Sequence, residues 1–378
     1  MHPETRLAHG GGLDPASGAV TPPVHVSTTF ARDAEGALRG EHQYARSGNP
    51  TREQFERVLA DLEAGAGEGH DLGCAAFASG MAATNALMQS LEKGAHVVLP
   101  DDVYYGTRAL LEDVFAQWGL SFTEADLTDP SALHDALRPA TRLVWAETPS
   151  NPLLRITDLE AVADAAHEAG ALLVADATWT TPLVQRPLTL GADAVVHSAT
   201  KYLGGHSDLL GGAVVAPAES DLFEQVRAVQ QTAGAVLGAR GAHLALRGMR
   251  TLGARLRLQQ QNAHRVARFL GGHDAVKRVH FPGLEDHPGH ATACEQMDGF
   301  GAMLSFEVKG GFERAKAVGG GCTVFIQATS LGGTESLIEH RAPVEPEGTT
   351  TPPNLLRLSV GLEHPDDLVA DLSRVLGD

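Results

Sequence analysis

Short apolar runs alternate with amphipathic segments between Cys74 and about Ala216, and this alternation limits the possible folds more than any other feature. Strands that alternate with helices favour a mainly parallel sheet with helices on both faces, so the sequence predicts an α/β fold. The expected strands are Cys74–Ala78, His96–Pro100, Ser121–Glu124, Arg142–Ala146, Ala171–Ala175, Ala192–His197 and Gly212–Ala216. The expected helices between them include Ala82–Leu91, Leu110–Trp118, Ser131–Leu137 and Asp158–Ala169.

The flanking segments predict an arm and a second domain. Residues 1 to 50 show little periodicity and carry clusters of glycine and proline, as expected of an extended arm. Helical patterning starts at Thr51, where Thr51 and Gln54 have the spacing of a capping box. A helical stretch over Ala242–Leu270 leads to expected strands at Met303–Val308 and Leu355–Val360 and expected helices at Phe312–Val318 and Asp366–Val375. We therefore expect an arm (1–50), a large domain (51–246) and a small α/β domain (247–378).

Composition excludes several classes of protein. The 378 residues suffice for one large and one smaller core. No run of eighteen apolar residues occurs and the first residues are polar, so we expect neither a membrane span nor a secretory signal. The net charge of −18 argues against nucleic-acid binding, which needs clustered lysine and arginine. Cys74, Cys294 and Cys322 lack disulfide or zinc spacing and the histidines are dispersed, so we expect no metal site and a reducing cytoplasm.

Lys201 lies shortly after the expected strand Ala192–His197 and just before a glycine-rich turn. Ser198 and Thr200 lie at period-two spacing, so in an extended chain their hydroxyls share one side and Lys201 faces the other. A lysine in this position is well placed to form a Schiff base with a carbonyl cofactor, with hydroxyls beside it to hold a phosphate. Because a lone lysine is more often a solvated surface charge, this hypothesis depends on the residues around it.

Other strand ends carry residues with complementary chemistry. Asp176 follows one expected strand, and Glu147, with Asn151 shortly after it, follows another. The first strand ends in Ser79-Gly80-Met81, which opens a helix and offers free backbone N–H groups to a phosphate. Each of these could be an ordinary cap or turn on its own. Since ligands bind at the carboxyl ends of the strands of an open parallel sheet, we expect the four strand ends to meet in one crevice.

Eight segments carry a specific resemblance to a known family. They are Tyr44-Ala-Arg46-Ser-Gly-Asn-Pro-Thr51, Ser79-Gly-Met-Ala-Ala83, Asp101-Asp-Val-Tyr104-Tyr-Gly-Thr107, Glu147-Thr-Pro-Ser-Asn151-Pro, Asp176-Ala-Thr-Trp179, Ser198-Ala-Thr-Lys201-Tyr-Leu-Gly-Gly-His-Ser-Asp208, Ser330-Leu-Gly-Gly-Thr-Glu-Ser-Leu-Ile-Glu-His340 and Leu356-Arg357-Leu-Ser-Val-Gly361. With these segments the chain resembles the trans-sulfuration (Cys/Met metabolism) enzymes that use pyridoxal 5′-phosphate (PLP), in particular cystathionine γ-lyases and γ-synthases. The resemblance implies fold-type I, with a large, mainly parallel sheet domain and a smaller C-terminal α/β domain.

The resemblance also implies how the cofactor is bound. Lys201 would carry PLP as a covalent aldimine and then move protons between the substrate Cα and the cofactor. Asp176 would pair with the pyridine nitrogen, which makes the ring an electron sink. The phosphate would be held by Gly80, Met81, Ser198 and Thr200, and from a neighbouring subunit by Tyr44 and Arg46. The active site would then need a dimer, and we expect self-association as a dimer of dimers.

Further residues are expected to act on a small amino-acid substrate. Tyr104 would stack on the cofactor ring and serve as acid or base toward the departing group; Tyr105 stands where the family usually has glycine, so it remains an alternative. Asn151 would contact the cofactor O3′ or the substrate carboxylate. Arg357 would clamp that carboxylate with its planar fork, and Ser330 would orient Lys201 or the carboxylate.

Departures from the family pattern bear on the reaction. Gly106 stands where methionine γ-lyases often have cysteine, which disfavours that activity. Thr329 stands at a substrate-binding position where γ-lyases and γ-synthases often have Glu, so the usual contact to a distal amino group is missing there. Residues 341–353 also differ from the usual pattern near the substrate entrance, where we expect specificity to be reset.

We therefore predict a γ-elimination or γ-replacement on cystathionine or an activated homoserine. The runner-up is a cystathionine β-lyase or cysteine desulfhydrase, followed by methionine γ-lyase, O-acylhomoserine sulfhydrylase and aminotransferase activities. A cofactor-binding regulator without chemistry is disfavoured, because Lys201, Asp176, Tyr104 and Arg357 are all present. We expect neither a nucleic acid nor a membrane as partner.

Overall fold

The computed structural model describes residues 1–65, 71–345 and 350–377, and the chain divides into two compact units. The first comprises Met1–Glu92 and Asp193–Gly253, and the second comprises Lys93–Ala192 and Ala254–Asp378. The domain boundaries expected after residues 50 and 246 stay a prediction. Among the described helices, none combines the length and the apolar character that crossing a membrane requires.

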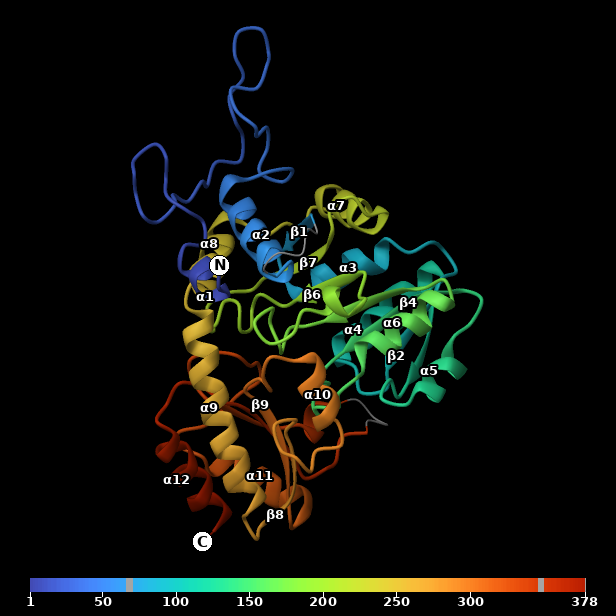
Figure 1. Cartoon of the computed structure of the whole chain (residues 1–378), viewed down its shortest axis with the longest axis vertical. Helices are drawn as coiled ribbons and strands as arrows, with labels where there is room; N and C mark the ends of the chain where they lie inside the picture. The colour runs from blue at the N-terminus through green and yellow to red at the C-terminus, as the bar shows by residue number, and fades with distance from the viewer. Residues whose placement is uncertain (66–70, 346–349, 378) are drawn as a thin grey trace. The chain divides into compact units, whose positions relative to one another are not determined.

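Three antiparallel strands form the sheet of the first unit (Figure 1). β7 (Gly212–Pro217) lies between β1 (Leu72–Phe77) and β6 (Ala194–His197). All three lie within one or two residues of the strands predicted from the apolar runs, and their central side chains are buried. The helices of this unit are α1 (Pro3–Ala8), α2 (Pro50–Glu63), α3 (Gly80–Gln89), α7 (Asp221–Ala233) and α8 (Ala239–Met249). Of these, α2, α3 and α7 pack directly on the sheet.

The start of α2 differs from the prediction. Its N-cap is Asn49, whose side-chain oxygen accepts the N–H groups of Thr51 and Arg52. The Thr51 hydroxyl instead accepts the N–H of His25 at 2.9 Å, so the predicted capping box is wrong. The contact ties the N-terminal arm to the helix, and Figure 1 shows the rest of the arm as blue loops that extend beyond α2.

Four parallel strands form one sheet of the second unit. Their order is β5 (Leu172–Asp176), β4 (Thr141–Glu147), β2 (His96–Pro100) and β3 (Ser121–Ala125), as the predicted parallel α/β pattern requires. The helix α6 (Leu159–Glu168) packs on β4 and β5 and buries Leu159 against Val144 and Leu173. A shorter helix, α5 (Pro130–Ala136), packs on α6 and β3.

The predicted helix over residues 110–118 is not one regular helix. A short α-helical turn, α4 (Tyr105–Ala109), continues as a π-helical turn over Leu110–Val114 and ends as a 3₁₀ turn over Phe115–Trp118. Leu111 and Phe115, four positions apart, are both buried.

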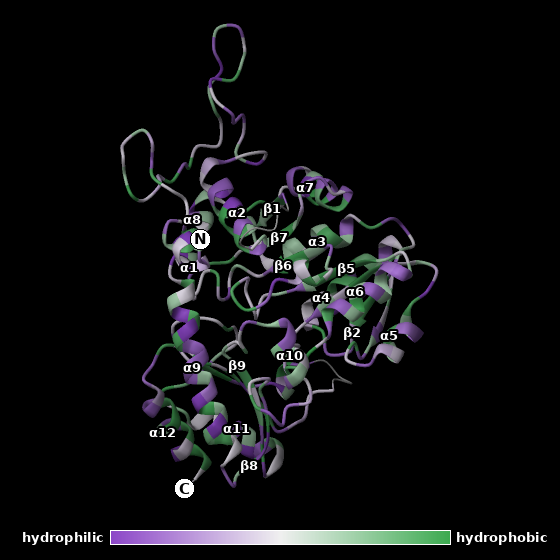
Figure 2. Cartoon of the chain, viewed as in Figure 1, coloured by the Kyte–Doolittle hydropathy of each residue, from purple (hydrophilic) through white to green (hydrophobic). Residues whose placement is uncertain are grey.

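A second, five-stranded sheet follows in the second unit. Its order is β10 (Ile326–Gln327), β11 (Leu337–His340), β12 (Leu355–Ser359), β9 (Met303–Val308) and β8 (Val276–His280). β9 and β12 confirm the predicted strands, whereas the short β10, β11 and β8 were not predicted. The remaining helices of this unit are α9 (Leu252–Gly271), α10 (His290–Gln296), α11 (Gly311–Gly321) and α12 (Pro365–Leu376). In Figure 2 both α9 and α12 carry hydrophilic and hydrophobic stretches, as expected of helices with one buried face.

The helical stretch predicted over residues 242–270 is two helices. α8 ends at Met249, and α9 begins at Leu252. The Thr251 hydroxyl and N–H both donate to the carbonyl of Gly248, a local bond that competes with continuation of the helix.

Candidate active site

Lys201 lies in a tight turn of the first unit, directly after β6. Its N–H donates to the carbonyl of Ser198 at 3.1 Å, and its carbonyl accepts the N–H of Gly205 at 2.7 Å. Because β6 ends at His197, the chain turns here instead of staying extended, and the predicted alternation of Ser198, Thr200 and Lys201 is wrong. The turn, not the pleat of a strand, sets the direction of the lysine side chain.

Two buried contacts hold this turn in place. A Cβ at Gly248 of α8 would lie 2.2 Å from the carbonyl oxygen of Gly204, so only glycine allows the helix to pack this closely on the turn. On β6, Nε2 of His197 lies 2.5 Å from Oε1 of Glu63, and both side chains are almost fully buried. The strand that leads to Lys201 is therefore anchored to α2.

Ser79, Gly80 and Ser198 form a polar cradle at the start of α3. The Ser79 hydroxyl caps the helix at its third amide, so the amides of Gly80 and Met81 come before the capped one. A Cβ at Gly80 would lie 3.0 Å from Oγ of Ser198, and one at Gly212 would lie 2.2 Å from the carbonyl oxygen of Ser79. The two glycines thus bring a helix N-terminus and a hydroxyl together, an arrangement suited to a phosphate.

The Thr200 hydroxyl has a structural partner. It accepts the N–H of Gly211 at 3.0 Å and donates to the carbonyl of the same residue at 3.2 Å. This pair of bonds closes the loop between Lys201 and β7. The expected contact of Thr200 with a phosphate stays a prediction.

Tyr44 and Arg46 lie together on the arm of the first unit. The Arg46 guanidinium lies 5.3 Å from the centroid of the Tyr44 ring, and Tyr44 is 44% exposed. Between them, the carbonyl of Ala45 accepts a 2.7 Å hydrogen bond from Arg52 of α2. The backbone between Tyr44 and Arg46 is thus held against α2, while the side chains of both residues reach solvent.

Glu147 and Asp176 are neighbours at the carboxyl ends of β4 and β5, as the strand pattern predicted. They are register partners in the parallel pair. The buried Glu147 carboxylate accepts the backbone N–H of Tyr104 at 2.8 Å. Burial and then the charge of Asp176 raise the pKa of Glu147 well above its usual range, although the bond from Tyr104 opposes the shift. Two adjacent carboxyl groups thus lie at the carboxyl ends of β4 and β5, and the raised pKa of Glu147 favours its neutral form.

Tyr104 and Tyr105 lie side by side where β2 leads into α4. Their ring centroids are 4.8 Å apart, and Tyr105 is 48% exposed whereas Tyr104 is partly buried. Burial, followed by the hydrogen bond with Tyr105, raises the pKa of Tyr104 to about 12. The Tyr104 phenol is therefore protonated at neutral pH and can donate a hydrogen bond.

Arg357 lies on β12 with its guanidinium held on both sides. Nη1 donates to Oδ1 of Asn151 at 2.9 Å, and Nη2 donates to Oε2 of Glu339 at 2.6 Å and to the carbonyl of Ser330 at 3.3 Å. The residue is 4% exposed. Burial, followed by the charge of Arg341, lowers the pKa of Arg357 to about 10, which leaves it charged at neutral pH.

Glu339, Arg341 and Glu345 extend this network and were missed from the sequence. Nη1 of Arg341 donates to the same Glu339 oxygen at 2.7 Å, and its Nε donates to Glu345 at 3.0 Å. Burial alone would lower the pKa of Arg341, but Glu339 and Glu345 outweigh it and raise the pKa. Glu339 of β11 lies opposite Arg357 of β12 in the strand register, a pairing that no local sequence pattern reveals.

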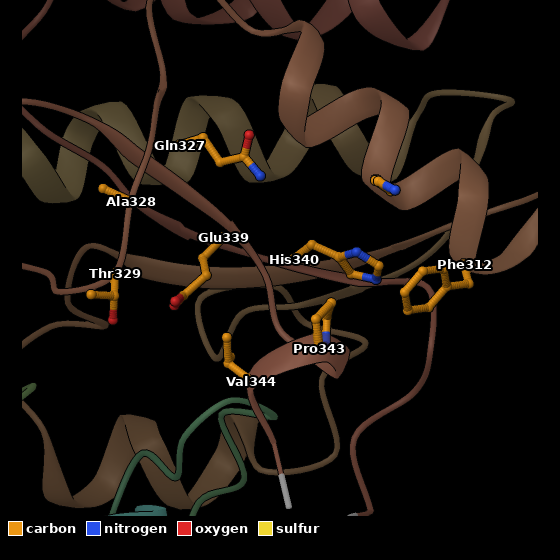
Figure 3. Close-up of a pocket in the computed structure, with 9 residues that line it drawn as sticks. Phe312, Gln327, Ala328, Thr329, Glu339, His340, Pro343 and Val344 are labelled. Atoms are coloured by element: carbon orange, nitrogen blue, oxygen red, sulfur yellow. The ribbon is translucent and has the colours of Figure 1, made fainter.

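The loop before β11 carries Ser330 and Thr329. Ser330 has a φ of 91°, a left-handed conformation that a serine adopts at a cost, and such strain often marks a functional site. Thr329 lines a cavity of about 400 Å³ beside Glu339 (Figure 3). Of the unusual stretch after His340, residues 346–349 lie outside the described residues.

The predicted residues thus gather in two groups, one in each unit. The first group offers a lysine amine and an anion cradle. The second offers a carboxyl pair, a phenol and a buried guanidinium. These groups match what PLP and an amino-acid substrate require, namely a phosphate seat, an amine, an acid for the ring nitrogen and a partner for the carboxylate. Within residues 1–65, 71–345 and 350–377, no three His, Cys, Asp or Glu side chains are arranged to hold a metal ion.

Comparison with known proteins assigns almost the whole chain to one family. Residues 4–377 match the family described as Cys/Met metabolism PLP-dependent enzyme. A cystathionine gamma-synthase of Mycobacterium bovis is 47% identical over 99% of this chain and 97% of the relative. A cystathionine beta-lyase of Coxiella burnetii is 43% identical over 99% of this chain and 98% of the relative.

A solved structure confirms the predicted fold class. The cystathionine gamma synthase of Xanthomonas oryzae pv. oryzae, in complex with aminoacrylate and cysteine, superimposes with a TM-score of 0.94 at 43% identity. The match covers 100% of this chain and 98% of that structure. The large, mainly parallel sheet domain with a smaller C-terminal sheet is therefore the fold expected from the sequence.

Proposed function

The chain belongs to the Cys/Met metabolism family of PLP-dependent enzymes, and we propose that it carries out γ-elimination or γ-replacement on cystathionine or an activated homoserine. It is a trans-sulfuration enzyme similar to cystathionine γ-synthases and γ-lyases along its full length.

Lys201 is the residue that we assign to covalent attachment of the cofactor. When bound at this site, PLP would supply an electron sink that makes the C–H bonds at Cα and Cβ of the substrate more acidic. The Lys201 amine then takes and returns the protons at these carbons. The cradle of Ser79, Gly80 and Ser198 holds the phosphate, with Met81 adding a backbone N–H.

The carboxyl pair on β4 and β5 has two separate tasks. As an anion, Asp176 would accept a hydrogen bond from the protonated pyridine nitrogen of the cofactor. Glu147, whose pKa burial raises, stays neutral and holds the backbone of Tyr104. Two adjacent carboxylates cannot both ionise easily, so a neutral Glu147 leaves the negative charge on Asp176.

Arg357 binds the substrate α-carboxylate. Its fork is held by Asn151 and Glu339, so little side-chain entropy is lost when a carboxylate binds. The carbonyl of Ser330 fixes the same guanidinium, which explains why the strained backbone at Ser330 matters. Tyr104, as a protonated phenol, donates a hydrogen bond to the departing sulfur or oxygen at Cγ.

The two γ reactions differ in the group that leaves Cγ and in whether another group replaces it. In γ-elimination, cystathionine and water give cysteine, 2-oxobutyrate and ammonia, and the Cγ–S bond breaks. In γ-replacement, the thiol sulfur of cysteine bonds to Cγ of an O-acylhomoserine, and the departing carboxylic acid takes up the thiol proton. The same proton transfers at Cα and Cβ serve both reactions.

The full-length similarity to a named cystathionine γ-synthase carries the γ assignment. The test is to incubate the purified enzyme with L-cystathionine and to measure the products by mass spectrometry. Cysteine with 2-oxobutyrate supports γ chemistry, whereas homocysteine with pyruvate would overturn it. A parallel incubation of O-acylhomoserine with cysteine separates replacement from elimination by the appearance of cystathionine.

A β-lyase is the second candidate, because a relative of that name is similar over almost the whole chain. A β-lyase breaks the Cβ–S bond and needs proton removal only at Cα. The product measurement above decides between the two reactions in one experiment. Transfer of the amino group to a keto acid, without breaking a C–S or C–O bond, would instead indicate an aminotransferase.

We further propose that the active form is a dimer of dimers in the cytoplasm. The exposed Tyr44 and Arg46 on the arm support this, since both side chains reach solvent on a fixed backbone. Sedimentation equilibrium tests the assembly. If Arg46→Ala lowers the affinity for PLP in a tetramer that stays intact, the arm contributes to cofactor binding.

A further inference from the structure

Cys294 and His290 form a pair on α10, apart from both residue groups of the candidate active site. They lie four positions apart, so their side chains share one face of the helix. Sγ of Cys294 lies 3.6 Å from Nε2 of His290, within hydrogen-bonding reach of a thiol. Glu295, the remaining charged residue of α10, follows Cys294 directly and so does not share that face. Because Cys294 is exposed, a small molecule in the solvent can reach its sulfur.

The second ring nitrogen of His290 decides which atom of the pair is the donor. Nδ1 of His290 lies 2.7 Å from the carbonyl oxygen of Pro282. A carbonyl oxygen only accepts hydrogen bonds, so Nδ1 carries a proton. In the neutral ring Nε2 is then unprotonated, and the Cys294 thiol donates to it. Transfer of the thiol proton to Nε2 gives a thiolate beside an imidazolium that keeps both of its contacts.

The imidazole of His290 is held in this orientation by its surroundings. Its ring stacks on Phe300, with centroids 5.6 Å apart and planes inclined by 24°. Its backbone N–H donates to the carbonyl of His287 at 3.0 Å, where α10 begins. At the end of α10, the Gln296 side chain donates to the carbonyl of Thr157 at 2.8 Å. A nucleophile, a base and a group that orients the base are thus in place together, as in sites with an activated thiol.

The other two cysteines lie in environments that suppress the thiolate. Cys74 is buried, and burial raises the pKa of its thiol well above the usual range. Burial, followed by the charge of Asp371, raises the pKa of Cys322 to about 12. The Cys322 thiol also donates to the carbonyl of Val318 at 3.4 Å. Both thiols therefore stay protonated at neutral pH, which leaves Cys294 as the cysteine that can react as a thiolate.

We propose that Cys294 is a nucleophilic thiol that His290 activates for exchange with small disulfides. The Cys294 thiolate attacks one sulfur of the disulfide and forms a mixed disulfide on the chain. The S–S bond of the reagent breaks, and its second sulfur leaves with the bonding electrons and takes up the proton from the imidazolium. The reagent is reduced as Cys294 is oxidised, so no other oxidant is needed. This modification site goes beyond the proposed γ reaction and does not depend on it.

Disulfide exchange on the PLP-loaded enzyme tests the proposal. Dithiobis(nitrobenzoate), an aromatic disulfide, releases a coloured thiolate when it reacts. Wild-type protein should release about one equivalent per chain in a fast phase, and Cys294→Ser should lose that phase. With cystine as the disulfide, peptide mass spectrometry should find the cysteinyl group on Cys294. A fast phase that persists in Cys294→Ser, or an adduct on Cys74 or Cys322 instead, would overturn the proposal.

His290→Gln distinguishes an activated thiol from one that is only accessible. Glutamine forms hydrogen bonds but cannot take the proton. A thiolate stabilised by imidazolium is more abundant at low pH and intrinsically less nucleophilic than an ordinary one. Wild type should therefore react about fivefold faster than His290→Gln near pH 6, and no faster near pH 9.

His134→Gln, at an exposed histidine of α5, is the matched control and should react like wild type at both pH values. If the ratio of the wild-type rate to the His290→Gln rate is the same at both pH values, His290 affects only access to the sulfur. That result would overturn the proposed activation.

Discussion

Arg357 donates a 2.9 Å hydrogen bond from Nη1 to Oδ1 of Asn151, although 206 positions separate the two residues in the chain. The bond joins the C-terminal sheet to the loop after β4, and both side chains are buried. Asn151 orients one arm of the fork, and Glu339 orients the other. A guanidinium positioned in this way is ready for a carboxylate before any substrate arrives.

Arg357→Lys tests this arrangement. Lysine keeps the positive charge but loses the fork and the bond to Asn151, so the KM for an amino-acid substrate should rise about 10- to 100-fold, with a smaller effect on kcat. Steady-state kinetics measure the split. Arg278→Lys on the exposed face of β8 is the control and should change neither constant. A fall in kcat at unchanged KM would show that Arg357 does not bind the substrate.

Tyr104→Phe tests the acid proposed for the departing group. Removing the phenol should lower kcat about 100-fold, the range for loss of one general acid. Tyr105→Phe should stay within about threefold of wild type, because Tyr105 is 48% exposed. With the pKa of Tyr104 at about 12, a rate loss below pH 10 comes from another group. Equal losses in the two variants would show that the structure misassigns the pair.

Glu63→Ala tests the buried partner of His197. Removing the Glu63 carboxyl leaves the buried Nε2 of His197 without its hydrogen-bond partner, which costs about 1–3 kcal/mol. Urea unfolding measures the change. The exposed pair Arg108–Glu112 gives the matched control, where Glu112→Ala should cost less than about 1 kcal/mol. Similar small losses in both variants would mean that the His197–Glu63 contact contributes no net stability.

Asp102 makes the stability of the protein depend on pH in a defined direction, and Asp102→Asn should remove that dependence. Burial raises the pKa of Asp102 to about 6, although the bond from Ser150 and the charge of Arg155 oppose the shift. The unfolded chain releases this proton near pH 4, so the native state holds more protons between about pH 4 and 6. The stability that this group contributes is complete below pH 4 and is lost as the pH rises through 6. Relative to wild type, Asp102→Asn should therefore gain up to about 3 kcal/mol between pH 4 and pH 7.

Asp371→Asn is the control with the opposite sign. Burial alone would raise the pKa of Asp371, but the N–H groups of Val324, Thr323 and Phe325 lower it to about 2. Its contribution is present above pH 4 and is lost as the pH falls toward 2. Unfolding free energies from pH 2 to 7 measure both variants. If the two differences from wild type shift in the same direction with pH, the assignments are wrong.

Patterns local in the sequence predicted most of the fold. The apolar runs located the strands because burial on both faces of a parallel sheet demands continuous apolar sequence. Asp176 and Glu147 could be placed at one edge because parallel strands end on the same side. Lys201 could be singled out, but its turn could not, because it depends on hydrogen bonds to Ser198 and Gly205 and on α8 packing from further along the chain.

Long-range pairing explains what the sequence did not reveal. Glu339 can accept a hydrogen bond from Arg357 only because β11 lies beside β12, which places the two residues opposite each other in the register. β11 has four residues, too few for a periodic signal. The cap at Asn49 was missed in favour of Thr51 because both residue types cap helices, and only the contact of Thr51 with His25 separates them.

The most direct test of the central claim locates the cofactor on the chain. The enzyme is reduced with borohydride, which turns the Schiff base into a stable amine, then digested and examined by mass spectrometry. We predict that the pyridoxyl group remains on the peptide that contains Lys201, and that Lys201→Ala protein retains none. A label on Lys93, Lys277, Lys309 or Lys316, or reduced wild-type protein without any label, would contradict the site proposed here.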